Sequence, residues 1–143
     1  MMKSCLYQQL YPQNELICYN GDIGNKMYFI STGKVELLLG DEMEILFEIL
    51  DENDFFGEGA LLHGRRAATA RARTSCELLS LCKKDFQFCM KDYPKVHQNF
   101  LSFAMKQKYR MKKRVSRKAM HAIQFNEIRN RKQSVRNRFI LIR

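Results

Sequence analysis

One short stretch of the chain, residues 55–70, contains an acid, Glu58, and a pair of arginines, Arg65 and Arg66, close to several glycines. Gly57 and Gly59 flank Glu58, and glycines let a backbone pass close to a ligand. A short helix that begins there would direct free N–H groups at an anion. The planar guanidinium of Arg66 can bind two phosphate oxygens at once. Glu58 would repel a phosphate, so we expect it to accept a hydrogen bond from a sugar hydroxyl. The stretch therefore predicts a site for a ribose phosphate.

The same residues also have simpler interpretations. Arg66 could form a surface ion pair with Glu58 or Glu77, and such a pair would contribute little to stability. Ala60 and Ala67 are small residues where a phosphate and a base would come close, although small residues also fit many crowded corners. Because Glu58 stands between two glycines directly after two phenylalanines, packing gives no reason for an acid there, and we favour the ligand-binding interpretation.

Several runs of residues carry a resemblance to a known family. The runs are Gly57-Glu58-x-Ala60-Leu61-Leu62, Arg66-Ala67-Ala68-Thr69, the upstream residues 17–30 with Gly33, and the downstream residues 76–81 and 92–94. Residues 55–70, here called the cassette, resemble the phosphate-binding cassette of cyclic-nucleotide-binding domains of the cyclic-nucleotide-gated and hyperpolarisation-activated channel type. The cassette is also similar to that of cyclic-AMP-dependent kinase regulatory subunits. The resemblance covers roughly residues 8 to 112.

The resemblance implies a fold, a ligand and a set of site residues. The fold would be an antiparallel β-roll of the jelly-roll kind, followed by a lid helix at about residues 95–112 that closes over the purine. Ala67 stands where a threonine in channels favours cyclic GMP, so we expect cyclic AMP, with cyclic GMP as the alternative. The implied ligand-binding residues are Gly57, Glu58, Gly59, Ala60, Arg66, Ala67, Gln107 and Met111.

Three departures from the family pattern predict a weakened affinity. Gly59 stands where a branched apolar residue is usual, and the loop between Glu58 and Arg66 is one residue short. Gln107 occupies a lid position that often holds an arginine. A glycine within a helical turn would also cost roughly 0.5–1 kcal/mol of stability.

The pattern of apolar residues predicts the elements that would position these groups. Short alternating runs at residues 16–19, 27–31, 35–39, 44–50, 67–73 and 76–82 are separated by turn residues, which is typical of antiparallel strands. Even spacing of this kind predicts about eight short strands in a mainly β domain. From Lys83 the period becomes helical, and Pro94 breaks or restarts that helix. We expect a lead segment at 1–11, the domain at 12–112 and a tail at 113–143.

Charge divides the chain into two parts. Residues 106–143 hold 14 of the 25 Lys and Arg residues and a single acid, Glu127. A tail this basic predicts contact with an anionic membrane surface or with calmodulin through residues 106–143. A solvated and largely disordered terminus is the alternative, and we do not expect a nucleic acid partner.

Composition limits the remaining classes. A phosphodiesterase would need His/Asp metal clusters, and a kinase would need its Gly-rich loop, lysine and Asp motifs. Neither set is visible in the sequence. We therefore expect a receptor and not an enzyme, with no cofactor and no metal. The five cysteines form no C-x-x-C pair and are interpreted as reduced packing residues. No apolar run reaches the roughly 18 residues of a membrane span, and no signal peptide is visible. We expect a cytoplasmic location.

Three kinds of protein could use such a receptor. A cyclic-nucleotide-regulated cation channel, with the domain at the inner face of the membrane and a homotetrameric assembly, is our first expectation. The second is a soluble cyclic AMP sensor or scaffold with a polybasic tail. A transcription factor with a helix-turn-helix is the weakest, because residues 113–143 offer no glycine turn and little apolar core.

Overall fold

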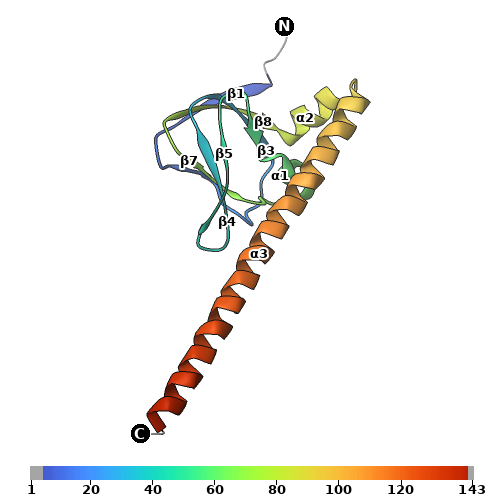
Figure 1. Cartoon of the computed structure of the whole chain (residues 1–143). Coiled ribbons are helices and arrows are strands. Elements are labelled where there is room, and N and C mark those ends of the chain that lie inside the picture. Colours follow the sequence, from blue (N-terminus) through green and yellow to red (C-terminus); the bar gives the residue numbers. More distant parts are fainter. Residues whose placement is uncertain (1–4, 142–143) are drawn as a thin grey trace. The chain divides into compact units, whose positions relative to one another are not determined.

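The computed structural model describes residues 5–141, and there two antiparallel sheets precede two of the three helices (Figure 1). One sheet has the strand order β1-β8-β3-β6 and the other the order β2-β7-β4-β5. The helices are α1 (Glu58–His63), α2 (Lys83–Met90) and α3 (Pro94–Leu141). The strands are β1 (Leu6–Tyr11), β2 (Leu16–Cys18), β3 (Lys26–Thr32), β4 (Val35–Leu39), β5 (Ile45–Leu50), β6 (Phe55–Phe56), β7 (Thr69–Ala72) and β8 (Cys76–Cys82).

The predicted fold class is confirmed: antiparallel sheets form a β-roll that a C-terminal helix follows. Every strand predicted from apolar alternation has a counterpart, displaced by one or two residues at some ends. Two strands were not predicted. β6 has only two residues, and β1 lies before Pro12, in the segment that we expected to lead into the domain. Its residues are mostly exposed at the edge of the sheet, so the sequence shows little of the apolar alternation of a buried strand.

The main core lies between the two sheets. Val35, Ala70, Ala72 and Leu78 are completely buried there, and small alanines on β7 let the sheets approach closely. A second cluster, of Met27, Leu61, Leu81 and Phe86, lies where α2 packs on β8 and β3. Phe100 of α3 packs against this second cluster, which anchors the first turns of α3 on the roll.

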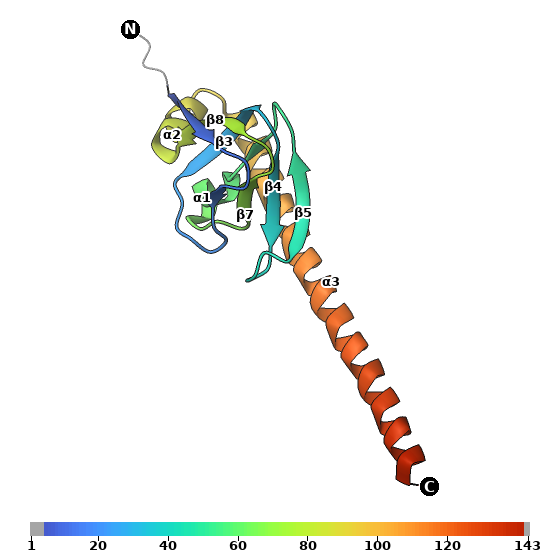
Figure 2. The same cartoon turned by 90° about the vertical axis from the view of Figure 1, so that its left-hand side faces the viewer.

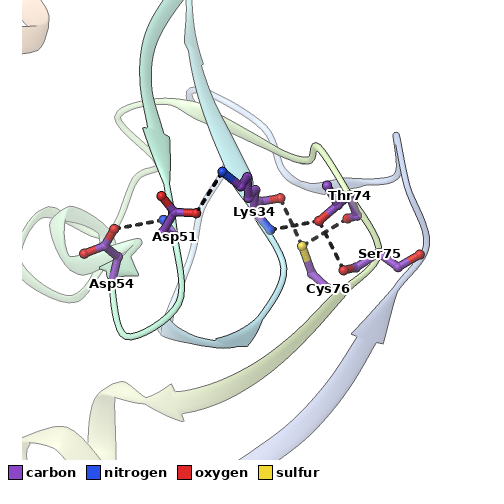
Figure 3. A network of polar contacts seen from close by, with 6 residues as sticks. All are labelled: Lys34, Asp51, Asp54, Thr74, Ser75 and Cys76. Carbon is purple, nitrogen blue, oxygen red and sulfur yellow. Dashed lines mark hydrogen bonds and ion pairs between the residues drawn. The ribbon is translucent and has the colours of Figure 1, made fainter.

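A network of polar contacts joins three turns at one end of the roll (Figure 3). Gly33 has φ +93°, and a Cβ there would collide with the carbonyl oxygen of Ser75, so the β3–β4 turn requires glycine. The next residue, Lys34, receives a hydrogen bond from the Cys76 thiol at its carbonyl (3.1 Å) and donates its amide to Thr74 Oγ1 (2.9 Å). Its ammonium group lies 3.3 Å from the carboxylate of Asp51. These contacts join the turn before β4 to the ends of β5 and of β7.

The chain divides into two compact units. The first compact unit ends at Met111 and the second comprises Lys112–Arg143. Pro94 occupies the first position of α3, where its missing N–H costs nothing. α3 is continuous through Leu141, so the basic tail is helical as far as the structure describes it. Within residues 5–141, no helix combines the length and the apolar character needed to cross a membrane.

Candidate ligand-binding site

A cavity of about 170 Å³ lies in the first unit, between the roll, α1 and the beginning of α3. The cassette identified in the sequence contributes to its wall. All eight residues that we expected to bind a ligand line it: Gly57, Glu58, Gly59, Ala60, Arg66, Ala67, Gln107 and Met111. Residues 57–67 are thus brought together with Gln107 and Met111, far away in the sequence, by α1 and by the return of α3 over the roll (Figure 2).

Arg66 is buried in the wall of this cavity, with only 8% of its surface exposed. Its Nη1 donates hydrogen bonds to the carbonyl oxygens of Lys26 (2.6 Å) and Gly57 (3.4 Å). Its guanidinium carbon also lies 5.6 Å from the centre of the Tyr28 ring. Within residues 5–141 it forms no ion pair, so the surface pairing with Glu58 or Glu77 is not what the structure shows. The Nε and Nη2 donors remain for a ligand anion.

Two glycines enclose the guanidinium of Arg66. A Cβ on Gly57 would come within 2.7 Å of Arg66 Nη1, and Gly57 has φ +83°, which disfavours any other residue. A Cβ on Gly24 would overlap Nε and come within 2.6 Å of Cζ. Gly24 was not among the predicted site residues, because the turn that carries it is 42 residues before Arg66 in the sequence. Only the folded chain reveals that this glycine makes room for the arginine.

Glu58 is the buried acid of the site, 7% exposed at the first position of α1. Burial raises the pKa of its carboxyl group, and the nearby Glu48 raises this pKa further, while a hydrogen bond from its own backbone N–H lowers it. Within the described part of the chain it forms no ion pair. A buried carboxylate without a cation is costly unless a donor satisfies it. The arrangement suits a hydroxyl donor from a ligand.

α1 begins where the sequence predicted a short helix. Gly57 is its N-cap, and no N-cap side chain in the described residues bonds to that end; the first amide, that of Glu58, donates to the carboxyl group of its own residue. Gly59 differs from Gly57: it needs no positive φ, and a Cβ there would lie 3.9 Å from that of Ala67, an ordinary contact. Space therefore does not require glycine at position 59.

The beginning of α3 closes the remaining side of the cavity. Ala104, Gln107 and Met111 are buried and line it, and Met111 also belongs to the main core. Gln107 Nε2 donates to Glu48 Oε2 of β5 (3.2 Å), and Gln107 Oε1 accepts from Arg110 Nη1 (2.8 Å).

Three contacts of aromatic rings support this closure. The Arg110 guanidinium lies 5.2 Å from the centre of the Phe47 ring on β5. The Phe55 ring lies 6.1 Å from that of Phe100 and 5.3 Å from that of Phe103. Residues 100–111 thus lie against β5 and β6, in the place expected of a lid.

Sequence reasoning missed several other lining residues. His63, Arg65 and Lys108 add polar groups, and Cys18 adds a half-buried thiol whose pKa burial raises. Arg65, the other arginine of the pair, donates from Nη1 to the carbonyl of Gly21 (2.9 Å) and so stabilises the turn at Gly21. Neither Lys108, which as the neighbour of Gln107 would not be expected on the same face of a helix, nor Cys18 offered a signal in the sequence.

Comparison with known proteins places this geometry in a family. The sequence model of the cyclic nucleotide-binding domain matches residues 8–93. The chain belongs to the cyclic nucleotide-binding domain family. The resemblance seen in the cassette is thereby confirmed, and the matched range includes β1 from Gln8 onward.

Two kinds of family member are similar to this cyclic nucleotide-binding domain. It is 33% identical over 132 residues to the cyclic AMP receptor protein of Thermus thermophilus, a match that covers 90% of this chain and 58% of that protein. It is 31% identical over 131 residues to the potassium/sodium hyperpolarization-activated cyclic nucleotide-gated channel 2 of Mus musculus, covering 89% of this chain and 15% of the channel.

A solved structure shows the same fold. The crystal structure of Thermus thermophilus Catabolite Activator Protein matches with a TM-score of 0.64 and 30% identity, over 71% of this chain and 49% of that one. The cyclic nucleotide-binding domain described here thus spans less than two thirds of the length of each of these relatives.

Proposed function

We propose that this chain binds cyclic AMP in the cavity beneath residues 100–111 and acts as a regulatory receptor without catalytic activity. The observation that carries the proposal is the meeting of Arg66 and Glu58 in the wall of one cavity, a buried cation and a buried acid that form no ion pair within residues 5–141. The Nε and Nη2 donors of Arg66 would bind the cyclic phosphate, and Glu58 would accept from the ribose 2′-hydroxyl.

We expect the binding of a nucleotide to change the position of residues 100–111, which form the lid. A ligand can shift the position of residues 100–111 only by its differential affinity for the closed arrangement, and such couplings are typically about 1–3 kcal/mol. Because Gln107 and Met111 line the same cavity as Arg66, a purine bound there would contact the lid directly. Nucleotide binding would therefore favour the closed lid.

The choice of base follows from the residue beside Arg66. Ala67 is exposed to the cavity and has no hydroxyl to meet a guanine edge, which favours cyclic AMP over cyclic GMP. Thermal denaturation of the purified chain with cyclic AMP, cyclic GMP or 5′-AMP tests this preference. We expect the largest rise in Tm with cyclic AMP and little with 5′-AMP. Ala67→Thr should narrow the gap between the two cyclic nucleotides; a larger rise with 5′-AMP than with either would reject the site.

We further propose that the receptor serves a cation channel regulated by cyclic nucleotides, as the similarity to a hyperpolarization-activated channel suggests. The alternative is a soluble cyclic AMP sensor, which the match to a cyclic AMP receptor protein supports. Six membrane-spanning helices encoded upstream in the same gene would decide for the channel. A complete reading frame that lacks them would decide for the sensor.

The basic second unit suggests a further partner. Residues 112–138 are all exposed, and basic side chains surround the helix instead of lying on one side. Its apolar residues, such as Met120, Phe125 and Ile128, do not form one stripe at 100° per residue, which gives little support to a calmodulin groove. We propose that this segment binds an anionic membrane surface by charge.

A further inference from the structure

Three cysteines that are far apart in the sequence converge at one edge of the first unit. Leu6 pairs with Leu81 in the antiparallel ladder of β1 and β8, so the residue before β1, Cys5, lies beside Cys82 at the end of β8. Cys82 is the N-cap of α2, and Cys89 lies seven residues later on the same helix. Since seven residues make almost two helical turns, Cys82 and Cys89 share a face of α2.

The contacts of these thiols distinguish one pair from the third cysteine. The Cys89 side chain lies within hydrogen-bonding reach of Cys5, and Cys82 lies close enough to help raise the pKa of the Cys5 thiol. Cys82 instead donates its thiol to the carboxylate of Asp85, with Sγ 3.1 Å from Oδ2. All three side chains are partly exposed, so a small oxidant can reach them. Among residues 5–141, no three His, Cys, Asp or Glu side chains are arranged to hold a metal ion.

We propose that Cys5 and Cys89 are a redox-sensitive pair that closes to an intramolecular disulfide when a hydroperoxide is present. One thiolate attacks the terminal peroxide oxygen, the O–O bond breaks, and a sulfenic acid and water form when hydrogen peroxide is the oxidant. The second thiol attacks the sulfenic sulfur, the S–O bond breaks, and a second water leaves. Two thiols are oxidised, one peroxide is reduced, and the protons leave in the two water molecules.

The environment of Cys5 sets the pH dependence of this reaction. Burial, together with the neighbouring Asp85 and Cys89, raises the pKa of the Cys5 thiol. The thiolate is the reactive form, so the pair reacts slowly near neutral pH and faster as the pH rises. Such a pair responds to sustained peroxide and not to brief exposure.

The disulfide would restrain the helix that precedes the lid. α2 lies between β8 and α3, and the ring of Phe86 on α2 lies 4.7 Å from that of Phe100 and 5.8 Å from that of His97. A bond from Cys5 to Cys89 ties α2 to the start of β1. We expect this restraint on α2 to change the dissociation constant for cyclic AMP at least threefold after oxidation, an expectation that rests on the proposed function.

The test treats the full chain with hydrogen peroxide at pH 8, blocks the remaining thiols, and maps disulfides by mass spectrometry without reduction. We expect a Cys5–Cys89 peptide pair, the loss of two of the five free thiols, and reversal by dithiothreitol. Cys82→Ser should still form the bond, whereas Cys5→Ser and Cys89→Ser should not. Circular dichroism establishes that each variant is folded.

Two kinds of result would overturn the proposal. A bond from Cys82 to either partner in the wild-type chain, or oxidation beyond sulfenic acid without a disulfide, would show that the pair is not Cys5 and Cys89. Titration of the reduced and oxidised chain with cyclic AMP separates the remaining claims. A disulfide with an unchanged dissociation constant removes the coupling to the lid, and an absence of nucleotide binding in the reduced chain counts against the proposed function alone.

Discussion

At the scale of single residues, the site depends on an arginine that other residues hold in place. The Arg66 side chain is buried among the carbonyls of Lys26 and Gly57, the ring of Tyr28 and the bare backbone of Gly24. Ordering a long side chain costs up to about 2 kcal/mol of rotamer entropy. Because folding has already ordered Arg66, a ligand phosphate would not have to offset that cost.

Gly24 and Gly59 provide a matched pair of substitutions. Gly24→Ala places a methyl group against the buried Arg66 guanidinium and would displace it from the carbonyls that hold it, so we expect a lower Tm and a loss of cyclic AMP affinity of about tenfold or more. Gly59→Ala meets no obstacle in a helix and should raise stability by roughly 0.5–1 kcal/mol. Denaturation and titration of both variants check this; equal affinities would show that Gly24 does not position Arg66.

We expect Glu58 to lower the stability of the folded chain and to strengthen the binding of cyclic AMP. Its pKa is raised in the folded state, so between about pH 4.5 and that raised value the folded chain holds more protons than the unfolded chain, and stability falls as pH rises through this window. Glu58→Gln removes the buried charge. We expect a higher Tm at pH 7, a smaller gain at pH 4, and an affinity for cyclic AMP about fivefold lower, because a neutral acceptor bonds less strongly.

Denaturation curves of wild type and Glu58→Gln at pH 4 and pH 7 measure this difference. A gain in Tm that is the same at both pH values would mean that the charge of Glu58 does not oppose folding. A lower Tm for the variant at pH 7 would mean that the carboxylate has a stabilising partner.

At the scale of elements, Gln107 links the lid to β5. Gln107→Ala removes the bond to Glu48 and the acceptor for Arg110, and we expect a loss of about 1 kcal/mol in stability and weaker cyclic AMP binding. Gln133→Ala is the control, because its bond to Asn137 is exposed and lies in the second unit. Chemical denaturation and calorimetry compare the two. Equal effects of the two substitutions would show that the Glu48 contact does not hold the lid.

The elements that the sequence predicted best are those with a local signal. The turns at Gly33 and Gly40 have positive φ and separate apolar runs, so the strands around them could be predicted from the chain alone. The cassette was recognisable because Gly57, Glu58 and Arg66 lie within ten residues. β1 was missed because its residues are mostly exposed at the edge of the sheet, so no apolar alternation marks it.

The same limit applies to the site. That Gly24 lies against Arg66, and that Glu48 bonds to Gln107, follows only from the register of distant strands and helices. The five cysteines show the effect again: their spacing offered no pair, whereas the fold brings Cys5 to Cys89. Residue type therefore predicted the chemistry of the site, and tertiary structure supplied the residues that position it.

At the scale of the whole molecule, the chain consists of a first unit that contains the cavity and a basic second unit, and we expect the first to fold without the second. Residues through Met111 form their own core, so a chain that ends at residue 118 should keep its Tm within a few degrees and its affinity for cyclic AMP. It should lose flotation with liposomes that contain phosphatidylserine, which we expect of the full chain at low salt and not at high salt. Liposomes of phosphatidylcholine alone are the control. Flotation of the shortened chain would place the membrane contact in the first unit.

The measurement that tests the central proposal most directly is calorimetric titration of the purified chain with cyclic AMP, alongside Arg66→Ala and Arg73→Ala. Arg73 is bonded to Glu36 outside the cavity and is the matched control. We predict one saturable site in wild type and in Arg73→Ala, and an affinity about 10- to 100-fold lower in Arg66→Ala, the loss of a charge-assisted contact worth about 1.5–3 kcal/mol. Absence of binding by a folded wild-type chain, or equal affinities in all three, would contradict it.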